Sequence, residues 1–189
     1  MPLIQKPGGT QVWQLNIDCE EKKNDTRPGK KWDDCMVEEL CKLVSDFNKI
    51  DRNKLKTVSP SPSTPGSPLN SKYTAGLLAF SERFAGAVGK TPQDTAFIKS
   101  QFSTDCRYEK WKKGEPPPPG AANPIREGEG AMNPDHVHDA KLGGPLGDID
   151  GLKWMNARVN TTAGATMRGY PPDPKPGPQV EAMPNCGCT

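Results

Sequence analysis

Three side chains that can do chemistry lie close together in the last third of the chain. His136 and His138 are the only histidines, and Asp135 directly precedes the first of them. In a strand, histidines two residues apart project from the same face. A neutral imidazole can take a proton from water near pH 7, and a carboxylate can help to hold a divalent cation. The two histidines could also hold zinc in a zinc hydrolase, but the sequence supplies no evident third ligand.

The residues after Asp135 predict the elements that position these side chains. The glycines and proline at 143–145 indicate a turn, and 152–155 has the pattern of a returning strand. An Asn suited to a helix N-cap opens a predicted helix at 156–167. Strand, loop, strand and helix would bring Asp135 and its histidine neighbour close to the first helical turn, where Asn160 lies.

In this order and spacing, the residues resemble the His-Asn-His (HNH) nucleases, a family also called the ββα-metal fold. The family's first strand ends in Asp-His-hydrophobic, as at 135–137, and a Gly-Gly turn follows at the distance of 143–144. After the turn, Leu152 and Met155 match apolar positions of the family, and Asn160 matches its closing Asn or His.

Two stretches within residues 135–168 are similar to HNH-like domains at the C-termini of bacterial polymorphic toxins. They are HDAKLGGP at 138–145 and VNTTAGATM at 159–167. The resemblance implies a metal-dependent endonuclease, a hydrolase acting on DNA rather than RNA, that is secreted or delivered by a non-classical route into the cytoplasm of a target bacterium. The partners it implies are the nucleic acid substrate, a cognate immunity protein and a secretion-system component.

The same resemblance assigns roles to individual residues. It makes His136 the general base, with a divalent metal held by Asp135 and Asn160. Mg²⁺ or Mn²⁺ is favoured, because an Asp and Asn ligand pair leaves positions open for water. His138 is either a third ligand or the group that orients the base. The candidates for contact with substrate phosphates are Arg158 and Arg168. The alternative, given equal weight, is that both residues only belong to the solvent-exposed face of the helix.

The chain departs from the family pattern in the loop between the strands. Gly151 stands where the family has the middle Asn that braces this loop. Asp150 and Asp148 are nearby, and we expect Asp150 to take over the bracing. The cysteines that often bind structural zinc in the family are replaced by Asn156 and Val159, so no structural zinc is expected. The lost Asn favours the main alternative, a non-catalytic interaction protein with a degenerate ββα module.

Composition limits the size of the core. Hydrophobic residues make up 33% of the 189 residues, against 19 Gly and 21 Pro, which excludes one large core. No apolar run approaches a membrane span, and no classical signal peptide is visible. The net charge of +2 does not by itself indicate nucleic acid binding. DNA affinity would therefore have to come from the cations at 107–113 or from the metal.

Composition and periodicity divide the chain into six segments. They are a strand-and-helix region at 1–56, a Pro/Ser linker at 57–72, a helical pair at 73–113, a Pro-rich arm at 114–132, an HNH-like ββα nuclease module at 133–170 and a Pro-rich, Cys-containing tail at 171–189. Within them we predict a strand at 12–17 and helices at 34–50, 73–88 and 91–113. The expected fold class is α+β, mainly α: a helical N-terminal region, a small C-terminal ββα-metal module and long Pro/Gly-rich loops.

The six cysteines contain no CxxC pair, which argues against a zinc site built from thiolates. Their even number permits disulfides without requiring them. Cys186 and Cys188 could pin the proline-rich tail to other cysteines, whereas two such ligands alone would not close a metal site.

Overall fold

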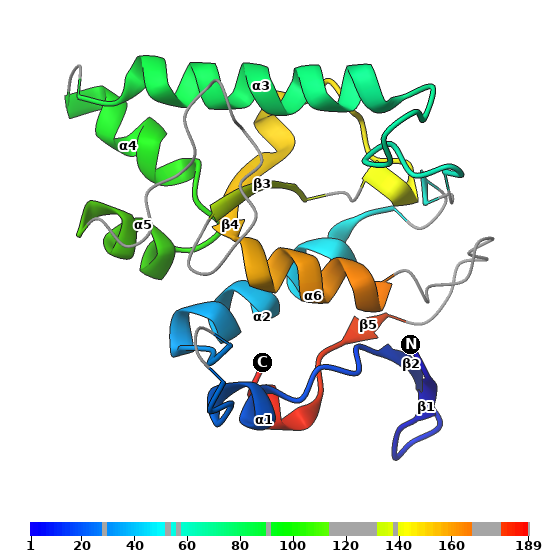
Figure 1. Ribbon diagram of the computed structural model, residues 1–189. Coiled ribbons are helices and arrows are strands. Elements are labelled where there is room, and N and C mark those ends of the chain that lie inside the picture. The colour runs from blue at the N-terminus through cyan, green and yellow to red at the C-terminus, as the bar shows by residue number, and fades with distance from the viewer. Residues whose placement is uncertain are drawn as a thin grey trace.

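The computed structural model has a mixed α and β fold in which helix predominates, in agreement with the expected α+β, mainly α class (Figure 1). It describes residues 1–27, 30–51, 54–55, 58–89, 92–113, 132–137, 140–167 and 179–188. The helices are α1 (Cys19–Lys23), α2 (Asp34–Lys49), α3 (Asn70–Ala87), α4 (Pro92–Ser100), α5 (Asp105–Lys112) and α6 (Ala157–Met167). The strands are β1 (Leu3–Gln5), β2 (Gln11–Gln14), β3 (Met132–His136), β4 (Leu152–Asn156) and β5 (Val180–Glu181).

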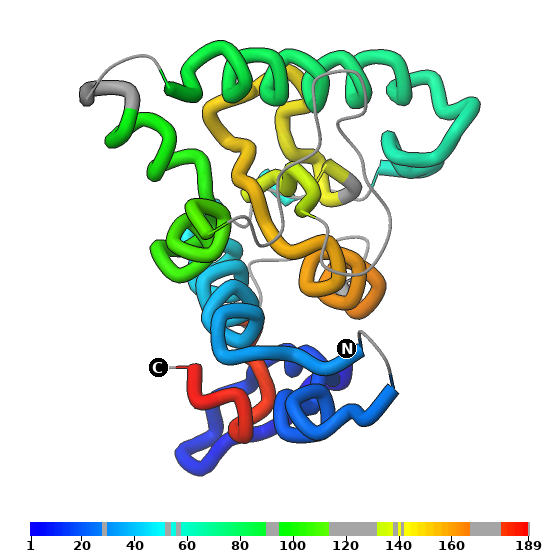
Figure 2. Tube along the Cα trace, turned by 60° about the vertical axis from the view of Figure 1, so that its left-hand side comes forward, coloured from blue at the N-terminus to red at the C-terminus, as the bar shows by residue number. Residues whose placement is uncertain are grey.

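The antiparallel hairpin of β3 and β4 lies in the middle of the molecule, with helices on both of its faces (Figures 1 and 2). Its register pairs Asp135 with Lys153 and His136 with Leu152. Trp154 is fully buried against α3, while the next residue, Met155, belongs to the core that α2 and α6 share. The hairpin therefore separates two modest cores, because alternate side chains of a strand point to opposite faces.

Helix α2 follows the prediction made from its sequence. Met36, Leu40 and Phe47 recur at helical spacing, and all three are buried in the core on the α6 side of the hairpin. The side chain of Asp33 caps the first turn by accepting a hydrogen bond of 2.8 Å from the Met36 N–H.

Helix α3 begins earlier than predicted. Its first residue, Asn70, lies inside the segment predicted as an extended linker at 57–72, so that boundary was wrong. The Asn70 side chain donates a hydrogen bond of 3.0 Å to the Pro62 carbonyl, which ties the start of the helix to the preceding turns. One face of α3 then packs against the hairpin through Leu77, Phe80 and Phe84.

The single helix predicted at 91–113 is wrong, because the chain breaks into α4 and α5. Between them the backbone pairs with β4: Trp154 N–H donates to the Gln101 carbonyl at 2.7 Å, and Ser103 N–H donates to the Trp154 carbonyl at 2.9 Å. The Thr104 hydroxyl then caps α5 by accepting from the Arg107 N–H. Pairing with a strand distant in sequence overrides the local helical pattern here.

Both ends of the chain meet in a small second sheet of order β1-β2-β5. The predicted strand at 12–17 is shorter in the structure, where β2 ends at Gln14. Part of the proline-rich tail forms β5, which pairs in parallel with β2 through Val180 opposite Trp13. This sheet lies at the opposite end of the molecule from α3 (Figure 2).

Disulfides fasten the tail to the rest of the chain. The pairs are Cys19–Cys186, Cys35–Cys106 and Cys41–Cys188, which use all six cysteines. The tail is thus pinned at two neighbouring points, as the sequence permitted.

Several predicted features lie outside the described residues. The arm at 114–132 is among them except for Met132, which opens β3. His138, Arg168 and residues 171–178 of the tail are outside as well. Among the described helices, none is both long and apolar enough to cross a membrane.

Candidate functional site

The hairpin and helix α6 place the chemistry-bearing residues identified in the sequence. Strand β3 ends at His136, and the next N–H, that of Val137, donates to the Gly151 carbonyl at 3.0 Å. After β4, the Asn156 side chain caps α6 by accepting from the Arg158 N–H at 2.9 Å. The predicted order of strand, loop, strand and capped helix is therefore present, and Asn160 lies in the first turn of the helix.

The loop between the strands is braced by Asp148, and the expectation that Asp150 would do this is wrong. The Asp148 carboxylate accepts hydrogen bonds from the N–H groups of Asp150 and Gly151, at 3.1 and 3.3 Å. Asp150 instead is exposed and forms an ion pair with Arg83 of α3. An Asp side chain suits this role because it can accept from backbone N–H groups two or three residues further along.

Three of the predicted site residues line one small cavity. Asp135 and His136 from the end of β3 and Asn160 from α6 all contribute to its wall. Leu43 and Phe47 of α2 close the wall from the other side. The cavity volume is about 10 Å³, which is close to what one water molecule needs. Residues that are far apart in sequence thus share a space the size of a single small ligand.

Asp135 and His136 leave β3 on opposite faces. His136 is 7% exposed, and its ring stacks on Tyr73 of α3 with 5.7 Å between the ring centroids. Asp135, one residue earlier, belongs to the face that α2 and α6 cover. The imidazole is therefore held on the α3 side of the hairpin, while the two oxygen-bearing side chains lie on the α6 side.

Asp135 also borders a second and much larger cavity. This space of about 910 Å³ extends between the hairpin, α2 and the junction of α4 with α5. Lys153 lines it and lies opposite Asp135 in the strand register. Burial, together with the nearby positive charge of Lys42, lowers the pKa of Lys153. Its Nζ donates a hydrogen bond of 2.6 Å to the Ser100 carbonyl.

The donors at the small cavity fit a hard cation. Asp135 offers carboxylate oxygens and Asn160 an amide oxygen, which are ligands that Mg²⁺ and Mn²⁺ accept alongside water. Among the described residues, no group of three His, Cys, Asp or Glu side chains forms a metal cluster. The cavity has the volume of about one water molecule, so a cation that keeps several water ligands would need more room than it offers. The third predicted donor, His138, lies outside the described residues.

Among the cations predicted at 107–113 to supply DNA affinity, Arg107 is enclosed within the protein, so the prediction is wrong for this residue, whereas Lys112 and Lys113 are exposed. Arg107 is 1% exposed and forms a buried ion pair with Glu39, with Nη2 and Oε2 at 2.7 Å. Lys110 pairs with Asp33, also at 2.7 Å. An arginine enclosed in this way has no route to a phosphate.

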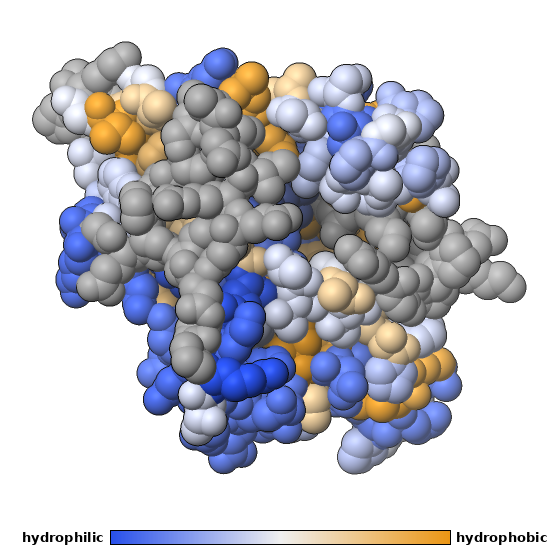
Figure 3. All heavy atoms as spheres, viewed as in Figure 1, coloured by the Kyte–Doolittle hydropathy of each residue, from blue (hydrophilic) through white to orange (hydrophobic). Residues whose placement is uncertain are grey.

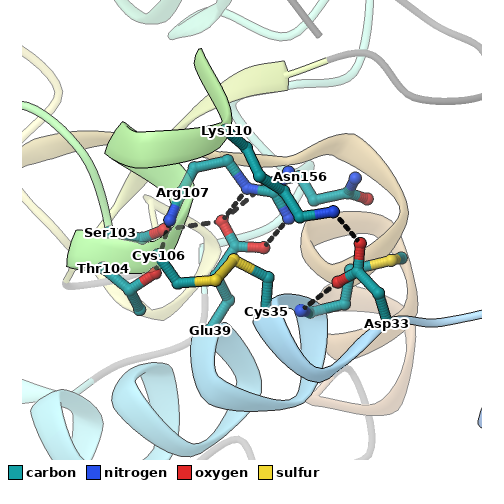
Figure 4. The surroundings of a disulfide bond; sticks show 10 residues. Asp33, Cys35, Glu39, Ser103, Thr104, Cys106, Arg107, Lys110 and Asn156 are labelled. Atoms are coloured by element: carbon teal, nitrogen blue, oxygen red, sulfur yellow. Dashed lines mark hydrogen bonds and ion pairs between the residues drawn. A yellow bond between two sulfur atoms is a disulfide. The ribbon is translucent and has the colours of Figure 1, made fainter. Parts of the chain in front are cut away.

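Glu39 joins three elements around that ion pair (Figure 4). Its Oε1 accepts hydrogen bonds from the Ser103 hydroxyl, the Arg107 Nε–H and the Asn156 N–H, at 2.7, 2.9 and 3.1 Å. Since Asn156 caps α6, this carboxylate helps to fix the start of the helix that carries Asn160. Nothing in the local sequence distinguished Glu39 from the other acidic residues of α2.

Arg158 lies in a cavity that the sequence did not predict. This space of about 540 Å³, the basic cavity, is lined by Lys22, Asp25, Arg27, Lys30, Trp32 and Arg158 together with the first turns of α6. Several of these residues belong to the run KKNDTRPGKKW at 22–32, whose density of Lys and Arg was the available signal.

No family model, curated protein or solved structure matches the chain.

Proposed function

We propose that this protein is a metal-dependent endonuclease that hydrolyses phosphodiester bonds, in DNA rather than RNA. The observation that carries the proposal is that Asp135, His136 and Asn160 all line one small cavity, with the side chains of Asp135 and Asn160 on the same side of the hairpin. Those three residues are the ones to which the HNH resemblance assigns chemistry. The order of β3, β4 and α6 supports the same proposal, with the ββα-metal arrangement as its structural basis.

Each residue has a defined task in the proposed reaction. Asp135 and Asn160 would hold a divalent cation through their oxygen atoms, and such a cation would offset negative charge on the scissile phosphate. His136 would take a proton from the attacking water, a role for which neutral imidazole is suited near pH 7. For this its ring would have to turn from Tyr73 toward the side of the hairpin that carries Asp135 and Asn160. The larger cavity beside Asp135 gives the phosphate a route to the site, and Lys153 supplies positive charge there.

We further propose that the enzyme acts as an antibacterial toxin that an immunity protein neutralises in the producing cell. Support comes from the resemblance to polymorphic-toxin domains and from the three disulfides, which suit a protein that passes through an oxidising compartment. A secretion-system component remains the proposed delivery partner.

A non-catalytic interaction protein is the second candidate function. One observation favours it: His136 is buried against Tyr73, and the small cavity is far too tight for a phosphodiester. Catalysis would require the substrate to enter from the larger cavity or the end of β3 to move. The two functions differ in whether purified protein cleaves DNA.

The test is cleavage of supercoiled plasmid by the full chain in Mg²⁺ or Mn²⁺, with EDTA as the metal-free control. We expect nicking by the wild type and a loss of about a hundredfold or more in the His136→Ala variant, the scale of a missing general base. Asn160→Ala should also weaken Mn²⁺ binding, measured by electron paramagnetic resonance without DNA.

Asp150→Asn is the matched control, because it removes an exposed carboxylate in the neighbouring loop, outside the small cavity. It should leave both cleavage and Mn²⁺ binding at the wild-type level. If the wild type cleaves DNA with neither metal, the endonuclease proposal is rejected in favour of the interaction protein. Equal activity in wild type and His136→Ala would reject the role of His136.

A further inference from the structure

The basic cavity combines positive charge with a helix N-terminus. Four basic side chains and one acidic side chain line it, and the acid, Asp25, is already engaged by Arg27. The hydrogen bonds from Arg27 hold the pKa of Asp25 well below its usual range. Lys22, Lys30 and Arg158 then give the cavity an excess of positive charge.

Helix α6 adds to this charge. Its first residues, Ala157 and Arg158, form part of the wall, so the positive end of the helix dipole lies at the cavity. Trp32 also lines the cavity and is 1% exposed, and its buried indole N–H makes no hydrogen bond to another described residue. A buried donor in this state is costly unless an acceptor is present.

The basic cavity has both polar and apolar walls. On the face drawn in Figure 3, hydrophilic side chains lie beside hydrophobic ones in the region that Figure 1 shows between α6 and α1. Lys30 is exposed and Arg158 is half-buried. An extended anion could therefore reach both from solvent.

The basic cavity is also close to the candidate catalytic residues. Asn133 of β3 lines it, and Asp135 lies two residues further along the same strand, which is a distance of about 7 Å. Arg158 and Asn160 lie within the first turn of α6. A polyanion seated in the basic cavity would thus pass beside the small cavity.

We propose that the basic cavity binds the backbone phosphates of the nucleic acid next to the scissile bond. The positive charges of Lys30 and Arg158, with Lys22 between the cavity and Glu21, act together with the N-terminus of α6. Placed beside β3, this charge suits a chain of phosphates better than a single small anion. The choice of nucleic acid as the polyanion rests on the proposed endonuclease function. The sequence-independent contacts made here would supply affinity and position, not base specificity.

The test measures binding separately from cleavage. A fluorescently labelled DNA duplex is titrated with the full chain in EDTA, and its anisotropy is followed at several NaCl concentrations. We expect the affinity of the wild type to fall as salt rises, because phosphate contacts release counterions. The Lys30→Gln/Arg158→Gln double variant should bind more weakly, with a log–log salt slope shallower by about two. Inorganic phosphate should compete with DNA only at much higher concentration.

Lys72→Gln is the matched control, since it removes one exposed lysine on α3, at the other end of the molecule. It should bind DNA as the wild type does. If the double variant loses thermal stability, Lys30→Gln alone serves in its place, with a slope shallower by about one. A double variant that keeps the wild-type affinity and slope overturns the proposal, as does a wild type that does not bind DNA.

Failure of this proposal and failure of the proposed function give different results. Binding that depends on Lys30 and Arg158 without cleavage in any divalent metal supports the basic cavity and rejects the endonuclease. Metal-dependent cleavage, together with DNA binding that does not depend on Lys30 or Arg158, supports the endonuclease and rejects the basic cavity as the phosphate site.

Discussion

At the scale of single residues, the buried ion pair of Glu39 and Arg107 matters most for the geometry of the site. Glu39 is fully buried, and it accepts hydrogen bonds from α5, from the segment before α5 and from the start of α6. A buried ion pair contributes little net stability compared with apolar residues, but removing one partner leaves an uncompensated charge. Its value here lies in fixing three elements relative to one another.

We expect Glu39→Ala to lower the free energy of unfolding by about 3–5 kcal/mol, as measured by urea denaturation. Glu38→Ala is the control, because Glu38 is exposed on the same turn of α2 and its loss should change stability by less than about 0.5 kcal/mol. Adding Arg107→Met to Glu39→Ala should restore part of the loss, since the buried charge is then gone. A Glu39→Ala protein as stable as the control would contradict this account.

At the scale of elements, the close approach of α3 to the hairpin loop depends on one glycine. A Cβ atom on Gly76 would lie 2.3 Å from the Leu146 carbonyl oxygen, a distance at which backbone must move. Leu146 belongs to the loop that joins β3 to β4. Gly76 therefore lets the helix that stacks Tyr73 on His136 pack tightly against the loop.

Gly76→Ala should destabilise the protein by about 1–3 kcal/mol despite the better helix propensity of Ala, because the contact is overpacked. Gly86→Ala, in the same helix, places its Cβ where no atom lies within 4 Å. It should be neutral or stabilising by up to about 1 kcal/mol. Thermal and urea unfolding of both variants would check this contrast, and a stabilising Gly76→Ala would show that α3 and the loop do not pack as described.

At the scale of the whole molecule, the disulfides of the tail act as one unit. Cys19–Cys186 and Cys41–Cys188 span 167 and 147 residues. Since Cys186 and Cys188 are almost adjacent, either bond alone already closes the large loop. The second bond then closes only a short loop, which consists of residues 19–41 and 186–188.

Removing one of the two bonds by Ser substitution should therefore cost about 3 kcal/mol, the value for a loop of some twenty residues. Removing both opens the large loop as well and should cost about 5 kcal/mol more than either single removal. Urea denaturation of the two double-Ser variants and the quadruple variant measures this excess. If the loss in the quadruple variant equals the sum of the two separate losses, the bonds constrain independent loops and the argument is wrong.

Much of the local structure could be predicted from the sequence, because it depends on near neighbours. The apolar spacing of Met36, Leu40 and Phe47 determined α2, and Asp33 and Asn156 marked helix starts through hydrogen bonds that span two or three residues. The order of β3, β4 and α6 followed from the same short-range rules, and with it the placing of Asp135 and Asn160 on the same side of the hairpin.

What only the tertiary structure decided are contacts between segments distant in sequence. Six cysteines allow fifteen pairings, and packing selected one. Backbone pairing with Trp154 interrupts the helix predicted at 91–113. Arg107, a candidate for phosphate contact, is instead buried in an ion pair with Glu39. Stacking on Tyr73 set the side of the hairpin on which His136 lies. A local pattern fixes how a segment can fold, but burial, charge pairing and backbone hydrogen bonding between segments decide which of its side chains meet.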